Sequence, residues 1–320
     1  MDAREPLAPE GSQLTLPVPA DFRLAPTVCS YGYFLLAPTF WDRHADTLLT
    51  RLAAGDRVVA LAVTHDRARR RLRIRCDLRL DPREAAAVRA GLHRMLRVGF
   101  DVKPWHRLSQ EAKRRGFGRL FRGASLFEDI VRTMTSCNVA WPNTVRMNLR
   151  LCELAGGGAF PTPARLASWE PQTLQARCRV GYRAARIVAL ARAVSDGGLD
   201  LDRLEDPARP TPELRDELLR IPGVGPYSAN NILQLLGRFE HLPIDSETHR
   251  HFREVHRLPE PATAAQRREL ERRIASHYDR YAPYQFLAYW FELMRGYEGR
   301  AGPIETWPEA KSQAFTARGV

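Results

Sequence analysis

The segment from Pro212 to Phe252 constrains this chain more than any other part of its sequence. It contains two helical patterns, at 212–220 and 226–236, which are separated by the run Ile221-Pro-Gly-Val-Gly225. Proline at or near the first position of a helix is favourable, because its missing N–H would have no partner there. Two glycines that are two residues apart allow positive φ and leave no Cβ in the way of a close approach. The segment therefore predicts a tight hairpin, 212–236, between two helices.

The amides of Gly223 and Gly225 would lie at the N-terminus of the second helix, the end that attracts anions. Main-chain amides in that position can receive a phosphate oxygen without reading a base sequence. An ordinary tight turn between two helices would use the same residues, and the local pattern leaves that alternative open. If the hairpin binds a DNA backbone, the residues expected to contact it are Gly223, Val224, Gly225, Tyr227 and Ser228.

The charge of the chain favours a polyanionic partner. The 320 residues include 49 Lys and Arg against 37 Asp and Glu, a net charge of +12 with a pI near 10.0. Only three of the basic residues are lysines, so a general preference for arginine is part of the composition. The run Asp66 to Ile74, DRARRRLRI, is a basic hairpin that serves equally well as a solvated turn or as a DNA contact. Charge alone does not decide the function.

The remaining pattern predicts a mostly α protein with an N-terminal antiparallel β domain, an α+β fold. Residues 1–20 are Pro-rich and are expected to form a flexible arm, and short apolar runs between 22 and 76 predict strands. Beyond Trp105 the pattern is helical. We therefore expect an α+β domain at 21–105, a helical domain at 106–300 and a tail at 301–320. Helices are expected at about 126–136, 142–154, 163–169, 182–197, 212–220, 226–236, 247–257, 263–277 and 283–295.

The hairpin segment resembles the helix-hairpin-helix-Gly/Pro…Asp (HhH-GPD) motif of the DNA glycosylase superfamily. In that motif the catalytic aspartate lies about twenty residues beyond the second hairpin glycine, and here Asp245 follows Gly225 by 20 residues. Leu242-Pro-Ile244 precedes the aspartate as an apolar run, as the motif requires. The chain is closest in kind to the 3-methyladenine glycosylase II and 8-oxoguanine glycosylase branch. The resemblance implies a base-excision repair enzyme that acts on double-stranded DNA containing damaged bases.

Asp245 also suits the chemistry that the resemblance implies. Breaking an N-glycosidic bond develops positive charge on the sugar, which a nearby carboxylate stabilises more in the transition state than in the ground state. The same carboxylate can orient or deprotonate the attacking water. Asp245 can also be the N-cap of the following helix, and the two roles are compatible. Glu247 is the rival carboxylate, and the spacing favours Asp245.

One departure from the motif concerns the reaction type. Bifunctional members place a lysine two residues after the second hairpin glycine, where its amine attacks the sugar. Here that position is Tyr227, and the three lysines are Lys103, Lys113 and Lys311. The sequence therefore predicts a monofunctional glycosylase without lyase activity.

Two upstream segments resemble elements that handle a flipped-out nucleotide. Met134-Thr-Ser-Cys-Asn138 is similar to the family helix whose terminal Asn or Gln fills the gap in the base stack, so Asn138 is expected to act there. A simple C-terminal helix cap is the alternative. Val180-Gly-Tyr-Arg-Ala-Ala-Arg186 resembles the GYRAR segment of 8-oxoguanine glycosylases, so Tyr182 and Arg183 are expected to wedge into the duplex. The beginning of an ordinary amphipathic helix is the alternative for that segment.

The resemblance favours an alkylated purine as the substrate, because members with an aromatic residue at the position of Tyr227 include alkylpurine enzymes. Such bases are cationic and can stack on electron-rich rings. We expect Tyr227 and Trp141 in the base pocket. A glycosylase for oxidised or mismatched bases and a non-catalytic DNA-binding protein remain the alternatives. Further rings that could line the pocket are Trp41, Trp105, Tyr182, Tyr289 and Trp290.

No cofactor or metal is expected, except that the resemblance implies a monovalent cation beneath the hairpin carbonyls. The five cysteines form no CxxC pair and none follows Cys178, so an iron–sulfur cluster is excluded. His249, His251 and His256 lack carboxylate or thiolate companions at ligand spacing and are interpreted as surface or phosphate-facing residues. The N-terminus has no apolar signal core and no apolar run is long enough to span a bilayer, so we expect a cytoplasmic, nucleoid-associated monomer that does not contact membranes.

Overall fold

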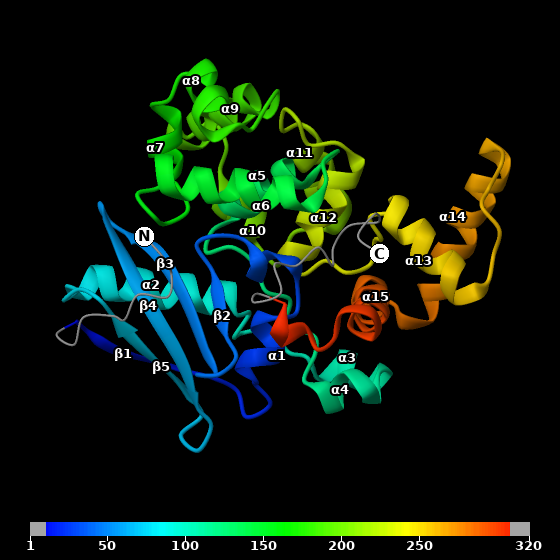
Figure 1. Cartoon of the computed structure of the whole chain (residues 1–320), viewed down its shortest axis with the longest axis horizontal. Coiled ribbons are helices and arrows are strands. Elements are labelled where there is room, and N and C mark those ends of the chain that lie inside the picture. The colour runs from blue at the N-terminus through cyan, green and yellow to red at the C-terminus, as the bar shows by residue number, and fades with distance from the viewer. Residues whose placement is uncertain (1–10, 308–320) are drawn as a thin grey trace.

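The computed structural model describes residues 11–307 and confirms the predicted α+β class (Figure 1). An antiparallel sheet and the helix α2 form one side of the molecule, and the helical part lies beside them. The sheet has the strand order β1-β5-β4-β3-β2, and every neighbouring pair is antiparallel. The strands are β1 Gln13–Pro17, β2 Phe40–Asp42, β3 Thr47–Ala54, β4 Arg57–Asp66 and β5 Arg71–Cys76.

Alternation of apolar and polar residues gives the sheet one buried face. In β5, Leu72 and Ile74 are buried, whereas Arg73 and Arg75 between and after them are exposed. Helix α2, Pro82–Met95, packs on the buried face through residues such as Val88 and Leu92. Its N-terminus is defined by Asp81, which accepts from the Glu84 amide at 2.8 Å and receives the reciprocal bond from the Glu84 side chain.

The expected arm and tail are wrong where the structure describes them. Residues 13–17, placed in the flexible arm 1–20, form the edge strand β1 because Leu14 and Leu16 alternate into the core opposite β5. At the other end, η4 (Ile304–Thr306) and Trp307 belong to the folded body, although the tail was expected from 301. Trp307 is 1% exposed and packs edge-on against the ring of Tyr297. Residues 1–10 and 308–320 lie outside the described part.

The helical part follows the expected pattern in its long elements. Helices α5, α9, α11, α12, α13, α14 and α15 lie where the periodicity predicts them, whereas α6 ends at Arg150 and continues as one π-helical turn, η2. The short helices α3, α4, α8 and α10 were not predicted as separate elements. The remaining bounds are α1 Leu24–Val28, η1 Gly32–Leu35, α3 Lys103–Leu108, α4 Gln110–Arg115, α5 Leu126–Ser136, α6 Trp141–Arg150, η2 Leu151–Ala155, α7 Pro163–Ala167, α8 Pro171–Cys178, α9 Arg183–Ser195, α10 Leu201–Glu205, α11 Thr211–Leu219, α12 Pro226–Leu236, α13 Ser246–His256, α14 Ala264–Tyr278, η3 Asp279–Tyr281 and α15 Gln285–Ala301.

The two hydrophobic cores do not follow the domain boundary expected at residue 105. One hydrophobic cluster joins the sheet and α2 to the C-terminal helices α13–α15, so it combines residues such as Leu61 and Phe286. The second cluster contains residues 126–233, from α5 to α12. The chain therefore leaves the first core after Phe121 and returns to it at Leu235. Sequence alone did not show this return, because it depends on contacts between distant segments.

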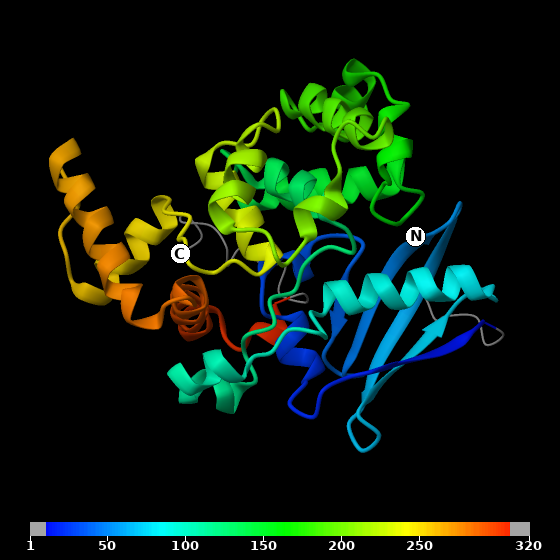
Figure 2. The same ribbon diagram turned by 180° about the vertical axis from the view of Figure 1, so that it is seen from behind.

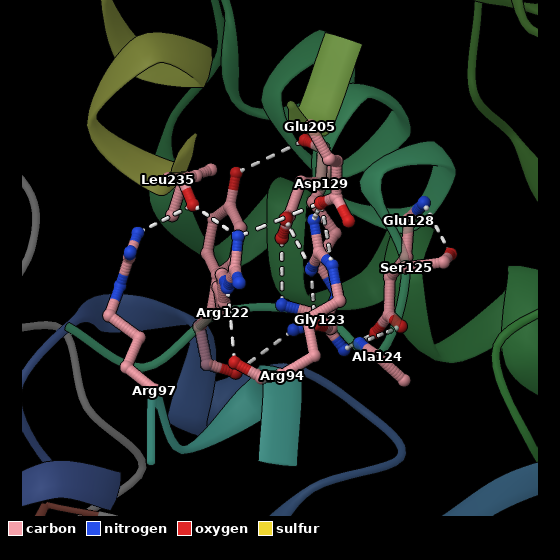
Figure 3. A network of polar contacts seen from close by, with 12 residues as sticks. Arg94, Arg97, Arg122, Gly123, Ala124, Ser125, Glu128, Asp129, Glu205 and Leu235 are labelled. Atoms are coloured by element: carbon pink, nitrogen blue, oxygen red, sulfur yellow. Dashed lines mark hydrogen bonds and ion pairs between the residues drawn. The ribbon is translucent and has the colours of Figure 1, made fainter. Parts of the chain in front are cut away.

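A buried polar network joins the two cores at the C-terminal end of α12 (Figure 3). The guanidinium of Arg97 donates to the carbonyl oxygen of Gln234 at 2.8 Å, and that of Arg122 donates to the Leu235 carbonyl at 2.8 Å. Arg94 forms an ion pair with Asp129 at 2.7 Å. Cations at the C-terminal end of a helix satisfy its last carbonyl groups and complement its dipole. The network thus holds α12 in place from the end opposite to the hairpin.

In the part of the chain from residue 11 to residue 307, no helix combines the length and the apolar character that crossing a membrane would require.

Candidate active site

Asp245 is the N-cap of α13, as the sequence allowed. Its backbone is extended, and its Oδ1 accepts from the Thr248 amide at 2.8 Å and from the Thr248 hydroxyl at 3.0 Å. The same hydroxyl lies 3.0 Å from the phenol oxygen of Tyr289 in α15. These contacts use only one carboxylate oxygen, so the cap orients the carboxylate and leaves Oδ2 directed elsewhere.

Tyr227 is the partner of that second oxygen. It lies in the first turn of α12, and its hydroxyl donates to Oδ2 of Asp245 at 3.0 Å. Burial and the negative charge of Asp245 raise the pKa of the Tyr227 phenol well above its ordinary value, so the phenol stays protonated and remains a donor. Asp245 forms no ion pair within residues 11–307, so neutral donors hold its charge without cancelling it.

Two cavities meet at Asp245 and Tyr227. The first, which we call the aromatic cavity, has a volume of about 540 Å³ and opens between α12, α13, α15 and the loop before η1. None of the residues that line it is Arg or Lys, and two, Asp245 and Glu247, are carboxylates. Its larger side chains are mostly aromatic: Tyr31, Tyr33, Trp141, Tyr227, Tyr289, Trp290 and Tyr297.

The second cavity, which we call the hairpin groove, has a volume of about 590 Å³ and opposite polarity. Its walls carry the guanidinium groups of Arg183 and Arg186, and Asp245 is the only acidic residue that lines it. The hairpin forms one side of the groove through Gly223, Gly225, Pro226, Tyr227 and Ser228. The two cavities share Ser136, Asn138, Val139, Tyr227, Asp245 and Ser246.

The two hairpin glycines have different backbone requirements. Gly223 has φ of +92°, and a Cβ built there would lie 2.5 Å from Cδ of Arg186. Gly225 is extended, with φ of −95°, and a Cβ there would meet nothing within 4 Å. Neither amide donates a hydrogen bond to another described residue. Gly223 therefore shapes the turn, and both amides are free to receive an anion.

Two of the residues predicted to contact a DNA backbone have other roles. Val224 is 6% exposed, and its amide already donates to the Ile221 carbonyl at 3.0 Å, so it belongs to the core. Ser228 is 5% exposed, and its hydroxyl lies 3.2 Å from Sγ of Cys137 on the wall of the groove. Gly223 and Gly225 line the groove with amides that donate to no other described residue.

The upstream residues also divide into two kinds. Asn138 lies just after α5, is exposed and has φ of +53°. It lines both cavities, a position that suits a residue expected to fill the gap in the base stack. Tyr182 is 55% exposed, and the guanidinium carbons of Arg183 and Arg186 lie 4.6 and 5.3 Å from its ring centroid. Arg183, predicted as a wedge, is instead 7% exposed and donates to the Met134 carbonyl at 2.9 Å. The Arg183 guanidinium thus binds the C-terminal end of α5.

Glu247, the rival carboxylate, is neutralised by its neighbours. Its Oε2 accepts from Arg250 at 2.8 Å, and its Oε1 accepts from the Tyr297 hydroxyl at 2.6 Å. A carboxylate whose charge is paired in the ground state gains less from a developing positive charge than one held by neutral donors. The geometry therefore favours Asp245.

The histidines pair with other residues. His251 is buried and lies 2.9 Å from Glu292, and His249 lies 3.4 Å from Glu271. The ring of His256 packs on Phe252, with their centroids 4.1 Å apart. The interpretation of His251 as a surface residue is thus wrong. No group of three or more His, Cys, Asp or Glu side chains within residues 11–307 is arranged to hold a metal ion.

The lysines lie away from the site. Lys103 begins α3 and Lys113 lies in α4, and both are exposed. In Figures 1 and 2 these two helices lie on the opposite side of α15 from the α11–α12 hairpin. Neither lysine lines the aromatic cavity or the hairpin groove. Lys311 lies outside the described residues.

Sequence reasoning missed three residues at the site. Tyr31, from the loop before η1, donates to Oδ1 of Asn231 in α12 at 3.4 Å and packs on Trp290 with centroids 5.0 Å apart. Asn231 donates in turn to the Tyr227 carbonyl at 3.0 Å. Arg186 lies across Gly223 at the groove. The GYRAAR run signalled Arg186, but nothing in the local sequence placed Tyr31 beside a helix 200 residues away.

Comparison with known proteins gives a consistent result at the level of structure. No family model matches the sequence, and no curated protein is significantly similar to it. Among solved structures, the 3-methyladenine DNA glycosylase from Archaeoglobus fulgidus aligns with a TM-score of 0.65 and 18% identity, over 88% of this chain and 97% of that chain. MBOgg1, solved with a low-affinity DNA ligand, aligns with a TM-score of 0.64 and 21% identity, over 91% and 98%.

The chain has the HhH-GPD glycosylase fold. The apo 8-oxoguanine glycosylase/lyase of Clostridium acetobutylicum shares it, with a TM-score of 0.61 and 17% identity over 87% of this chain and 96% of that chain. The glycosylase fold covers the sheet as well as the helices, so the predicted resemblance is confirmed for the whole architecture. Sequence identities of this size establish the fold, whereas the reaction depends on the residues of the site.

Proposed function

We propose that this protein is a monofunctional DNA glycosylase that removes a cationic, alkylated purine from duplex DNA. The observation that carries the proposal is the opposite polarity of the two cavities that share Asp245 and Tyr227. A nucleotide has an anionic backbone, and an alkylated purine base is cationic. The hairpin groove suits the backbone, and the aromatic cavity suits the base.

The hairpin groove offers three kinds of support to a DNA backbone. The free amides of Gly223 and Gly225 lie at the N-terminus of α12, and Arg186 lies beside them. Asn138 and Tyr182 stand at the edge of the groove, where a residue that replaces an extruded nucleotide has to be. All of these contacts are independent of base sequence, as repair of scattered lesions requires.

The aromatic cavity supports the choice of base. A cationic ring gains from stacking on Tyr and Trp faces, and the charge of Asp245 adds to that attraction. Trp141 and Tyr227, the two predicted pocket residues, both line the cavity. No Arg or Lys is among the described residues that line it, although the chain has a net charge of +12, and this disfavours an anionic ligand there.

The reaction that these residues support is hydrolysis at the anomeric carbon of the extruded nucleotide. Asp245 would stabilise the positive charge that develops on the sugar and orient the attacking water. Tyr227 would keep the carboxylate in place by its hydrogen bond to Oδ2. Among residues 11–307 no lysine lines either cavity, which supports release of the base by water and not by a protein amine.

A monovalent cation fits the hairpin by its donor chemistry. The carbonyl oxygens of Pro222 and Gly223 accept no hydrogen bond from the other described residues, and oxygen ligands are those that hard cations prefer. Such a cation would stabilise the turn and take no part in the reaction.

The test is an incubation of the purified protein with matched duplexes that carry an alkylated purine, an oxidised purine, a mismatch or no lesion, followed by alkaline cleavage of abasic sites. We expect cleavage after incubation with the alkylated duplex. Cleavage of the oxidised or mismatched duplex alone would retain the enzyme class and refute the substrate. No abasic sites in any duplex, together with retained DNA binding, would indicate a non-catalytic binding protein.

A further inference from the structure

One face of the sheet is open. Helix α2 covers the face that contains Leu61 and Leu72, as Figure 2 shows from that side, and Figure 1 looks onto the opposite face. A hollow of about 800 Å³ lies on the strands there. The residues that line it are Gln13, Leu14, Thr15, Asp42, Ala45, Thr47, Leu49, Ala62, Thr64, Arg69, Arg71, Arg73, Ile74 and Arg75.

Arginines dominate the hollow because they occupy alternate positions of β5. Arg71, Arg73 and Arg75 project from the same face, about 6.6 Å apart at two-residue steps along a strand. In the register of the sheet, Arg73 lies between Thr15 and Thr64 of the flanking strands. Small neighbours leave the guanidinium groups uncovered, and 56% of the Arg73 side chain is exposed. We call these three residues with Arg69 the arginine face.

The charge of the arginine face exceeds what nearby acids neutralise. Asp66, at the end of β4, lies 2.8 Å from Arg73, 3.4 Å from Arg71 and 3.8 Å from Arg69, so one carboxylate serves three cations. The hydrogen bond from Arg73 is the main cause that lowers the pKa of Asp66. Asp42 is the only acid that lines the hollow from residues 11–307. Arg75 forms no ion pair within the described chain.

We propose that the arginine face binds the phosphate backbone of a duplex DNA segment other than the one held by the hairpin groove. Guanidinium groups bind phosphate oxygens with two parallel hydrogen bonds, and the threonine hydroxyls beside them are further donors. The face has no exposed aromatic anchor of the kind that protein partners or single-stranded nucleic acids use. Its charge complements a phosphate backbone.

The position of the arginine face bears on how the protein would search DNA. In Figures 1 and 2 the turn between β4 and β5 lies at the opposite side of the molecule from α11 and α12. This separation supports a second duplex segment at the arginine face. One protein molecule would hold two segments, which allows direct transfer from one DNA segment to another during a search for lesions. Only the choice of duplex as partner rests on the proposed function.

The first experiment measures affinity for a short lesion-free duplex at several salt concentrations, so that no excision is involved. Because the slope of log K against log salt is about −0.9 for each phosphate contact, the double variant Arg73→Gln/Arg75→Gln should reduce the slope of one of the two duplex-binding steps by about 2 and leave the slope of the other unchanged. Arg73→Lys/Arg75→Lys keeps both charges and should keep the slope. Arg267→Gln/Arg268→Gln, on the exposed surface of α14, removes the same charge and is the matched control.

The second experiment detects bridging by energy transfer between donor-labelled and acceptor-labelled lesion-free duplexes at limiting protein. We expect transfer with the wild type and the lysine variant, and its loss with the glutamine variant. An unchanged salt slope together with unchanged bridging would overturn the proposal. Loss of binding to polyglutamate with an unchanged DNA slope would also overturn it and assign the face to an acidic protein. Neither the salt slope nor the energy transfer requires excision of a base. The second DNA site and the glycosylase activity are therefore tested separately.

Discussion

The hydroxyl of Tyr227 donates a hydrogen bond to Oδ2 of Asp245 across 3.0 Å, from the first turn of α12 to the N-cap of α13. The hairpin that positions the tyrosine and the helix that orients the aspartate are thus joined at the carboxylate proposed to stabilise the charge on the sugar. Removal of this hydrogen bond tests how much of the reaction depends on the orientation of the carboxylate.

Tyr227→Phe should lower the single-turnover rate of base release by a factor of about 10 to 10², since a hydrogen bond to a charged group contributes about 1.5–3 kcal/mol and each 1.36 kcal/mol changes a rate tenfold. Affinity for an uncleavable duplex should stay the same. Tyr297→Phe is the matched control, because it removes the 2.6 Å hydrogen bond to Glu247 in the same cavity. An unchanged rate in Tyr227→Phe would show that the cap alone orients Asp245.

Asp245→Asn should lower base release by a factor of about 10² to 10³ or more, because it removes the charge that stabilises the transition state. Binding to duplex DNA should persist, since the side-chain volume is nearly unchanged. The comparison is Glu247→Gln, whose carboxylate is already paired with Arg250. Activity that survives in Asp245→Asn and disappears in Glu247→Gln would move the catalytic role to Glu247.

Gly225→Ala separates DNA binding from folding. The added Cβ meets nothing within 4 Å and φ is negative, so stability should change by less than about 0.5 kcal/mol. Affinity should nevertheless fall equally for duplexes of any sequence, because the methyl group occupies the approach of a phosphate. Gly299→Ala, also at an open position, is the control. Gly223→Ala should destabilise the fold as well, because φ is +92° there. Undiminished affinity in Gly225→Ala would remove the hairpin from the interface.

The product should carry an intact strand. Borohydride added during turnover should trap no covalent protein–DNA adduct, because neither Lys103 nor Lys113, the two lysines in the described part of the chain, lines a cavity. Strands should break only after alkali or heat, and a glycosylase/lyase serves as the positive control. Efficient trapping would mean that an amine outside the two cavities reaches the sugar, and the monofunctional assignment would then be wrong.

Asp129→Asn should destabilise the protein by about 1.5–3 kcal/mol, because it removes one of the two carboxylates, Asp129 and Glu205, that pair with the buried Arg94 guanidinium. Asp129 is fully buried, accepts from the Gly123 amide at 2.7 Å and pairs with Arg94 (Figure 3). The free energy of unfolding in urea is the measurement. Asp216→Asn, an exposed residue of α11, should cost less than about 0.5 kcal/mol. Equal stability of the two variants would show that the network is dispensable.

The local elements of the site could be predicted from the sequence because short-range rules determine them. Two glycines in Ile221–Gly225 and a proline after them specify a hairpin, and the position of Asp245 before a helical pattern specifies an N-cap. The spacing of 20 residues between Gly225 and Asp245 was sufficient to select the catalytic candidate. These features depend on backbone conformation within a few residues, so they can be predicted from the sequence without a structure.

Tertiary structure decided which side chains are available and which face each other. Arg183 and Val224 belong to predicted motifs but are buried. Arg183 donates to the carbonyl of a distant residue, and Val224 packs in the core. Tyr31 reaches the aromatic cavity from the loop before η1, since the chain returns to its first core after Leu235. The opposite polarity of the two cavities has the same origin. It arises from residues brought together across the whole chain, and solvation and charge depend on those distant neighbours as much as on the residue itself.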